Sequence, residues 1–151
     1  MIQIRPLHAN DRDAWEGLFR QYLLFYERVE PQALYDRAWT EFVRDERMHA
    51  LVASTDGTLV GIAHFVFHAN TSAADVCYLQ DLFTAEPARR RGVGRALIEA
   101  VADAARARGC SRLYWMTQES NTVGRRLYDR VAEYRGFIRY QMPLPRSSLR
   151  T

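Results

Sequence analysis

Residues 82–94 carry the sequence LFTAEPARRRGVG and join a β-like run to a helix with one continuous apolar face. The first turn of any helix leaves backbone N–H groups without partners and carries a partial positive charge. Glycines at positions 92 and 94 let a bulky anion approach these donors closely. The stretch therefore favours a phosphate or pyrophosphate site, with the neighbouring arginines as additional donors.

A structural alternative is that the arginines only solvate the start of a surface helix and the glycines only permit a turn. The G-x-G pattern alone is short. Its spacing also differs from the phosphate loop G-x-x-x-x-G-K-S/T and from the dinucleotide fingerprint. ATP and NAD are therefore disfavoured as ligands.

The helix after this stretch is predicted from a regular apolar repeat between Val93 and Ala104, and Gly109 marks its end. Residues 112–117 follow as a short strand, which a right-handed crossover would place parallel to the strand at residues 75–84. Asn121 is expected to cap a further helix that runs to about Tyr134. A last strand is expected at residues 136–142, followed by a tail at residues 146–151.

The first half of the chain predicts a strand at residues 2–5 and two amphipathic helices. Asn10 is expected to cap the first helix from Asp11, and Pro31 to start the second, which should end near Asp45. Three strands follow at residues 48–54, 58–67 and 75–84, joined by turns at residues 56–57 and 70–72. The order predicts one α/β domain over residues 1–145 with a mixed, mostly antiparallel sheet and about four helices.

Composition limits the possible classes of protein. The chain has 151 residues, 48% hydrophobic and 26% charged, which is typical of one compact domain. It shows neither a membrane-spanning run nor a secretion signal, so a cytoplasmic location without membrane association is expected. The net charge is +3, but 18 acidic residues are interspersed with the basic ones, which disfavours a nucleic-acid partner.

A family resemblance rests on Arg89-x-x-Gly92-x-Gly94. This pattern resembles the coenzyme A signature Q/R-x-x-G-x-G/A of the GCN5-related N-acetyltransferases, and the predicted order of elements resembles that family's fold, with its splayed central strands. The resemblance implies that the N–H groups of Leu82 and Thr84 pair with the pantetheine arm and that the amides of residues 90–95 hold the pyrophosphate. The implied acetyl-coenzyme A site comprises Leu82, Phe83, Thr84, Arg89, Arg90, Arg91, Gly92, Val93, Gly94 and Arg95.

A second block, residues 121–128, resembles the family's N-x-x-A/G-x-x-L-Y helix. The resemblance implies that Asn121 contacts the pantetheine region and that Tyr128 acts as the general acid. A phenol with an ordinary pKa near 10 keeps its proton at pH 7 and can give it to a departing thiolate. The adjoining residues 127–132 and 136–140 most resemble the Hpa2-type members.

Residues 77–83 resemble the strand of the spermidine/spermine and thialysine acetyltransferases, in which Leu-Glu-Asp is usual. Gln80 stands here in place of the glutamate and cannot accept a proton from an attacking ammonium. The base is therefore Asp81, another residue or water. Residues that could contact the acceptor amine, unless the aromatic rings are core and the acids are solvated, are Tyr26, Glu27, Glu30, Trp39, Gln80 and Asp81.

Direct attack of the amine on the thioester is expected, without a covalent enzyme intermediate. Cys77 is expected to pack in a strand rather than to act as a nucleophile. No metal is expected, because His64 and His68 on one strand would be roughly 13 Å apart.

Two rival functions are a non-catalytic acyl-coenzyme A sensor, for which Gln80 argues, and a basic nucleic-acid-binding protein. A homodimer is also expected, because similar proteins often share or swap their last strand.

Overall fold

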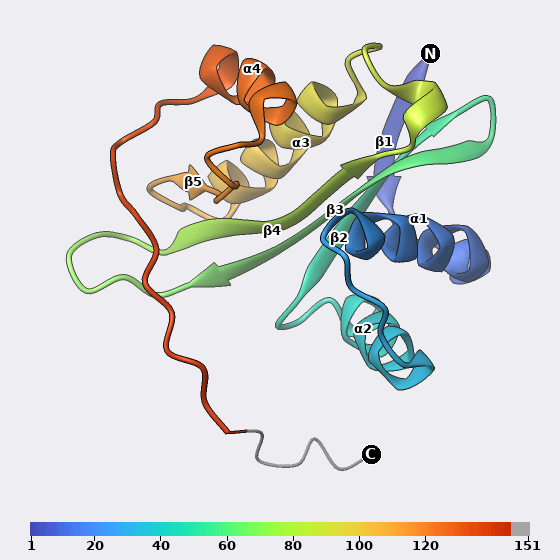
Figure 1. The fold of residues 1–151 in the computed structure, drawn as a ribbon, viewed down its shortest axis with the longest axis horizontal. Coiled ribbons are helices and arrows are strands. Elements are labelled where there is room, and N and C mark those ends of the chain that lie inside the picture. The colour runs from blue at the N-terminus through green and yellow to red at the C-terminus, as the bar shows by residue number, and fades with distance from the viewer. Residues whose placement is uncertain (146–151) are drawn as a thin grey trace. The chain divides into compact units, whose positions relative to one another are not determined.

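The computed structural model describes residues 1–145 and forms two compact units, Met1–Met116 and a second that begins at Thr117. In the first unit, the described residues form a five-stranded sheet with the order β1-β2-β3-β4-β5 (Figure 1). The strands are β1 (Ile2–Pro6), β2 (His49–Thr55), β3 (Thr58–His68), β4 (Val76–Thr84) and β5 (Leu113–Tyr114). The helices of this unit are η1 (Ala9–Asp11), α1 (Arg12–Phe25), α2 (Gln32–Arg44), η2 (Glu86–Ala88) and α3 (Val93–Ala107).

Strand directions match the predicted mixed sheet. β1 to β4 pair antiparallel in sequence order, whereas β5 pairs parallel to β4. The β2–β3 turn has positive φ at both central residues, Asp56 at 51° and Gly57 at 79°, as a two-residue hairpin requires. The α/β fold class predicted from the sequence is therefore confirmed.

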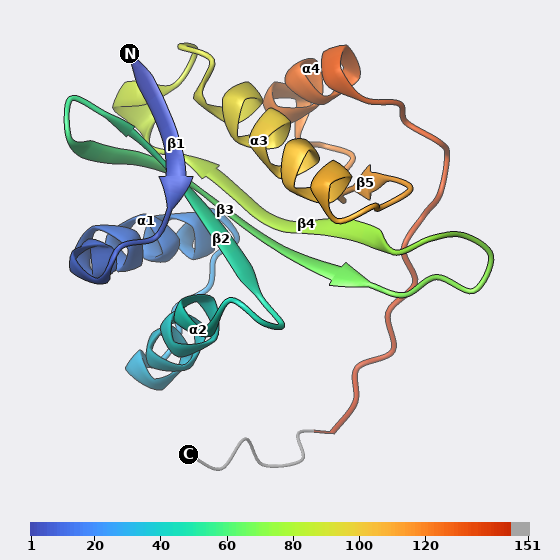
Figure 2. The ribbon, with the colours of Figure 1, turned by 180° about the vertical axis from the view of Figure 1, so that it is seen from behind.

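Helices cover both faces of this sheet. α1 and α2 lie on one face and α3 on the other (Figures 1 and 2). On the α3 face the helix approaches β3 closely at Gly61, where an added Cβ would lie 2.8 Å from Val93 Cγ1. On the α1 face a buried cluster forms from Trp15, Leu18, Phe19, Leu23, Tyr35, Ala38, Phe42, Val52, Ile62 and Phe83.

The predicted cap of the first helix is wrong. Asn10 lies inside η1, and α1 begins one residue later than expected, at Arg12. Asp11 is held elsewhere: its carboxylate accepts hydrogen bonds from the Arg5 guanidinium at 2.7 and 3.0 Å and from the His8 N–H at 2.6 Å. These contacts fix residues 8–11 as a separate turn before α1.

The second unit contains α4 (Thr122–Val131). Asn121 caps this helix as predicted, because its Oδ1 accepts the Gly124 N–H at 3.1 Å. The helix ends at Val131, about one turn earlier than the expected Tyr134.

The strand predicted at residues 136–142 is wrong, because no residue between 133 and 145 is in a strand or helix. A strand needs a neighbour for its N–H and C=O groups, and no described strand pairs with this segment. Its apolar side chains are exposed, with Phe137 at 87% and Tyr140 at 88%. The predicted tail, 146–151, lies outside the described residues, and the single-domain boundary remains a prediction.

Among residues 1–145, no helix is long and apolar enough to cross a membrane.

Candidate active site

The start of α3 presents a row of backbone donors. Gly92 is the N-cap with φ of 85°, and its carbonyl accepts the Ala96 N–H at 3.0 Å. The N–H groups of the first turn therefore point out of the helix without intrahelical acceptors. Arg90 also has positive φ, 65°, and left-handed residues that alternate with other conformations produce an anion-binding nest. The predicted pyrophosphate segment thus has suitable backbone geometry.

Space in front of this row is open. A Cβ added at Gly92 would meet nothing within 4 Å, although its φ disfavours any side chain. A cavity of about 400 Å³ adjoins the segment, lined by Arg91, Val93 and residues of β1 and the β2–β3 turn. No packed side chain therefore covers the backbone at Gly92.

The four predicted arginines differ in what they contact. Arg89 Nε donates to the Thr84 carbonyl at 3.0 Å, and its guanidinium lies 5.6 Å from the Phe83 ring centroid. Arg95 pairs with Glu99 one helical turn further on, at 3.1 Å. Arg90 and Arg91 are exposed. Arg89 therefore braces the loop in this structure, whereas Arg90 and Arg91 extend into solvent.

β4 leads into this row with one open edge. β5 pairs with it only at Cys77 and Tyr78 among the described residues. The Ala85 N–H donates to the Val60 carbonyl of β3 at 2.8 Å. Because alternate N–H groups along a strand point in opposite directions, those of Leu82 and Thr84 point away from β3. These are the two donors that the sequence analysis assigned to the pantetheine arm.

A β-bulge at Gln80 sets the direction of the side chains before this edge. His64 pairs with Asp81, whereas the next residue of β3, Phe65, pairs with Leu79, so Gln80 is the extra residue. The bulge lets Asp81 face α1 together with its cross-strand partner His64. Gln80 itself is exposed.

Asp81 is the end of a chain of hydrogen bonds that reaches into the core. The Trp15 indole N–H donates to His64 Nε2 at 2.9 Å, and His64 Nδ1 lies 2.9 Å from Asp81 Oδ2. Trp15 and His64 are 0% and 1% exposed, whereas the Asp81 side chain is 16% exposed. Only the carboxylate end of this chain therefore approaches solvent.

Tyr22 of α1 lies beside this carboxylate, and Tyr26, the C-cap residue of that helix, packs against the Tyr22 ring. The Tyr22 hydroxyl donates to the Gln80 carbonyl at 3.5 Å, and the rings of Tyr22 and Tyr26 are 5.2 Å apart. Burial, and next to it the charge of Asp81, raises the pKa of Tyr22. Tyr22 therefore stays a neutral phenol. Of the residues predicted to contact the acceptor amine, the structure therefore places Tyr26, Gln80 and Asp81 near one another.

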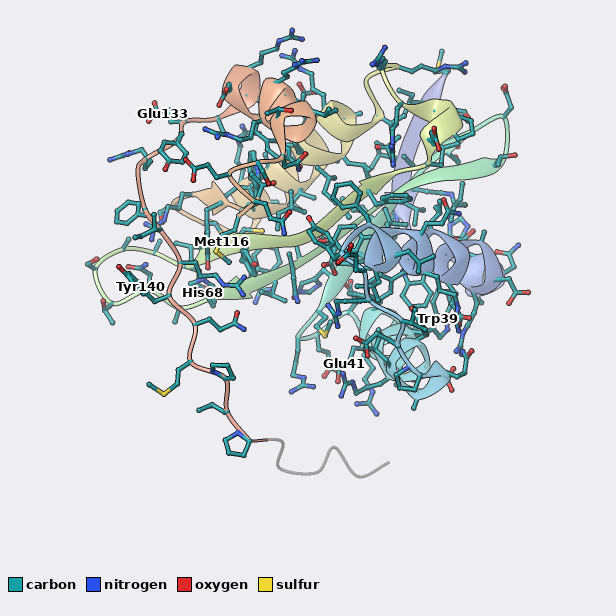
Figure 3. The ribbon with its side chains drawn as sticks, viewed as in Figure 1. Trp39, Glu41, His68, Met116, Glu133 and Tyr140 are labelled. Carbon is teal, nitrogen blue, oxygen red and sulfur yellow. The ribbon has the colours of Figure 1, made fainter. Side chains whose placement is uncertain are left out.

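Other members of that set are placed differently. Trp39 packs against Trp15 with ring centroids 5.2 Å apart, where α1 and α2 face each other (Figure 3), so its ring belongs to the core packing. Glu27 sits in the turn after α1 with φ of 56°. Glu30 pairs with Arg28 at 2.9 Å.

Sequence reasoning missed the roles of Tyr22, His64 and Trp15. The sequence analysis did not single out Tyr22 or Trp15, and it considered His64 only as a metal ligand. The available signal was one histidine inside an otherwise apolar strand, at residues 58–67, because an imidazole buried there requires polar partners.

In the second unit, both ends of the Asn121 amide are engaged. Its Nδ2 donates to Thr117 Oγ1 at 2.9 Å while Oδ1 caps the helix. A Cβ added at Gly124 would lie 2.6 Å from that Nδ2, so any residue other than glycine there would displace the Asn121 side chain. Tyr128 lies on α4 and is half-buried. The roles of Asn121 and Tyr128 toward a ligand remain predictions.

Comparison with known proteins agrees with the fold. Residues 15–134 match the model of the acetyltransferase (GNAT) family, so this chain belongs to that family of acyl-transferring enzymes.

Individual relatives carry acetyltransferase names. The chain is 32% identical over 135 residues to the D-amino-acid N-acetyltransferase HPA3 of Saccharomyces cerevisiae, covering 87% of this chain and 84% of the relative. It is 26% identical over 131 residues to the aminoglycoside N(6')-acetyltransferase type 1 of Salmonella typhimurium, covering 84% of this chain and 88% of the relative.

A solved structure shares the fold. The aminoglycoside acetyltransferase AAC(6')-Iy, in complex with the bisubstrate analog CoA-S-monomethyl-acetylneamine, matches with a TM-score of 0.84 and 21% identity, covering 96% of this chain and 99% of that one. The predicted family and fold are confirmed, whereas the Hpa2-type subdivision remains a prediction.

Proposed function

We propose that this chain transfers an acetyl group from acetyl-coenzyme A to a primary amine by direct attack within a ternary complex. The observation that supports the proposal is that unpaired backbone N–H groups continue from the end of β4 to the start of α3. The outward N–H groups of Leu82 and Thr84 lead directly to the row at the start of α3. An amide-containing arm joined to a pyrophosphate has acceptors for both sets.

The residues that would hold the coenzyme follow from this continuity. Leu82, Phe83 and Thr84 would line the arm, and the amides of residues 90–95 would bind the pyrophosphate. Arg90 and Arg91 are exposed and would add charge-assisted contacts. Asn121 keeps the contact with the pantetheine region that the family resemblance implies. The coenzyme would supply the activated acetyl group as a thioester.

In the proposed reaction, the amine nitrogen attacks the thioester carbonyl carbon. An ammonium acceptor first loses one proton to water and attacks as the neutral amine. The C–N bond forms and the C–S bond breaks, the nitrogen gives its next proton to the Asp81 carboxylate, and the sulfur receives one from the Tyr128 hydroxyl. Asp81 then returns its proton to solvent and Tyr128 regains one from solvent. No bond to the enzyme forms. Burial raises the pKa of Cys77 to about 12, which disfavours it as an acylated nucleophile.

A small cationic amine is the acceptor class that the surroundings of Asp81 favour. A carboxylate at 16% exposure beside the Tyr22 ring, which in turn contacts the Tyr26 ring, suits an ammonium group. The relatives named above act on D-amino acids and aminoglycosides, according to their names. Both substrate classes carry primary amines, so both belong in the first set of acceptors to be tested.

The first experiment is thiol release from acetyl-coenzyme A with D-amino acids, aminoglycosides, polyamines and a basic peptide as acceptors. Turnover with one class is expected, and Tyr128→Phe should reduce it about 100-fold or more, because general acid catalysis typically contributes at least this factor. Coenzyme binding without turnover on any acceptor would instead support the sensor.

Coenzyme binding is tested by Gly92→Glu, with Gly109→Glu as a matched control. Both glycines have left-handed φ, 85° and 81°, and open space around an added Cβ, but they flank opposite ends of α3. Similar strain is therefore expected, while calorimetry should show lost coenzyme binding only for Gly92→Glu. Undiminished coenzyme binding by Gly92→Glu would contradict the proposed pyrophosphate site. Nucleic-acid binding that weakens steeply with salt and is unaffected by Gly92→Glu would support the basic-protein alternative.

A homodimer through residues 136–144 belongs to the same proposal. This segment exposes Phe137, Ile138, Tyr140, Met142 and Leu144 by 70% or more. Contiguous exposed apolar side chains mark association sites, and a second copy of the chain could offer this segment the strand partner that it needs. The expected result is a dimer by light scattering that Phe137→Asp with Tyr140→Asp converts to a monomer. A monomeric wild-type chain would contradict the dimer alone.

A further inference from the structure

The buried chain from Trp15 to Asp81 has only one consistent arrangement of protons. An indole N–H can donate but cannot accept. His64 Nε2, which lies 2.9 Å from it, must therefore be the unprotonated acceptor nitrogen. In a neutral imidazole the proton then resides on Nδ1 and is donated to Asp81 Oδ2. Trp15 thus fixes the tautomer of His64, and His64 fixes one oxygen of Asp81.

A charged His64 would break this arrangement. Protonation of Nε2 would place two N–H donors against each other, in a residue that is 1% exposed and stacked on Phe42 at 4.2 Å. The Asp81 carboxylate faces Nδ1 and does not relieve the clash of the two donors at Nε2. His64 therefore cannot act as the base, although it lies directly beside the carboxylate.

The neighbouring packing holds both side chains in place. His64 contacts the Phe19 ring edge-on at 4.8 Å and the Phe42 ring face-on, so its plane is fixed from two helices. Asp81 follows the bulge at Gln80, which directs it toward α1. The other oxygen of Asp81, Oδ1, is outside the His64 contact, and the neighbouring Tyr22 hydroxyl also hydrogen-bonds with this carboxylate at the α1 side.

We propose that Trp15 and His64 are positioning residues that orient Asp81 toward the acceptor amine. This inference rests on the proposed transfer reaction and adds to it the source of the carboxylate's orientation. One oxygen of Asp81 is held by His64, and the other receives an N–H of the acceptor and then its proton. Specificity for an amine would thus depend on two residues that touch no substrate.

The tautomer is measured directly by long-range 1H–15N NMR of the imidazole ring at neutral pH. The expected spectrum has a protonated Nδ1 and an unprotonated Nε2 for His64. Trp15→Phe removes the donor and should release this preference, so that Nε2 gains a proton in part of the molecules. A protonated Nε2 in the wild-type chain would overturn the inference.

Catalysis provides the second readout, with Val52→Ala as the matched control. Val52 is fully buried in the same cluster, so this variant reproduces a loss of core packing. His64→Leu should lower kcat/KM by about 10- to 100-fold, as the loss of an outer partner of a functional group typically does. Its coenzyme affinity should be unchanged. His64→Asn, which can still offer an N–H donor to Asp81, should recover part of the loss.

Rates are normalised to the coenzyme-binding fraction, so a lower folded population does not imitate the effect. Equal rates for His64→Leu and Val52→Ala would overturn the positioning role. Absence of turnover in the wild-type chain would overturn the transfer reaction and the role together. Turnover in a wild-type chain with a protonated Nε2 would overturn the role alone.

Discussion

Two histidine–aspartate pairs in the first unit differ in what surrounds them. His64 and Asp81 lie 2.9 Å apart, and Trp15 binds the second nitrogen of His64. His49 and Asp45 lie 2.5 Å apart, but the Asp45 side chain is 70% exposed at the left-handed end of α2. Judged by distance alone, the second pair would be the stronger interaction. Its solvated carboxylate is free to reorient, so only the first pair has a defined direction.

The largest expected effect comes from neutralising each carboxylate in turn. Asp81→Asn should lower kcat/KM by about 100-fold or more, the usual contribution of a general base, because an amide cannot take the amine proton. Asp45→Asn, the matched change in the exposed pair, should leave kcat/KM unchanged. Steady-state kinetics on the best acceptor measure both, and equal effects would show that the buried pair has no special role.

The next largest effect should be a difference in the free energy of unfolding between variants of the two histidines. His64→Leu leaves the Trp15 N–H and the Asp81 carboxylate without their partner and should lower the free energy of unfolding by about 2 to 4 kcal/mol. His49→Leu disturbs a pair with a solvated carboxylate and should cost about 1 kcal/mol or less. Urea unfolding measures both, and a smaller loss for His64→Leu would contradict the comparison.

Asp11 is a third carboxylate for comparison. It is buried, but its partner is the charged Arg5 guanidinium and not a neutral imidazole like the one beside Asp81. The Arg5 guanidinium lowers the pKa of Asp11 below its ordinary value of 3.8. Its contribution to stability is therefore present in full above that value and is lost as the pH falls through the lowered pKa of the folded state. Asp11→Asn should cost about 1 to 3 kcal/mol at pH 7 and flatten the acid limb of the stability profile. An unchanged acid limb would contradict this assignment.

The smallest expected effect concerns the two cysteines, again one residue type in two settings. Cys77 is fully buried with a pKa raised to about 12, whereas Cys110 is partly exposed. In the native protein, a thiol reagent should therefore label Cys110 about 100-fold or more faster than Cys77. Cys77→Ala should retain transfer activity. Loss of activity without unfolding would instead support a mechanism in which Cys77 is acylated.

Local patterns predicted most of this fold. The α3 repeat between Val93 and Ala104, the stop at Gly109 and the turn at residues 56–57 depend on neighbours in sequence, and all were confirmed. The strand expected at residues 136–142 depended on a partner elsewhere in the chain, and no described strand provides one. Pattern alone cannot reveal which strand, if any, is available for pairing.

The candidate site also has one part that local sequence predicts and one part that depends on strand pairing. The donor row at residues 90–95 is continuous in sequence and could be predicted from its glycines and the helix that follows. The chain through Trp15, His64 and Asp81 joins residues 49 and 17 positions apart. It also depends on a bulge at Gln80 that only the register of β3 and β4 defines. Such a chain becomes visible only when the strands are paired.

The open edge of β4 has a consequence for the protein's behaviour in solution. Unpaired N–H and C=O groups on a sheet edge can template pairing with other chains, which promotes aggregation. An arm bound along Leu82 and Thr84 would cover that edge and serve as its missing neighbour. Coenzyme binding should therefore keep the protein dispersed during concentration and storage, besides preparing it for reaction.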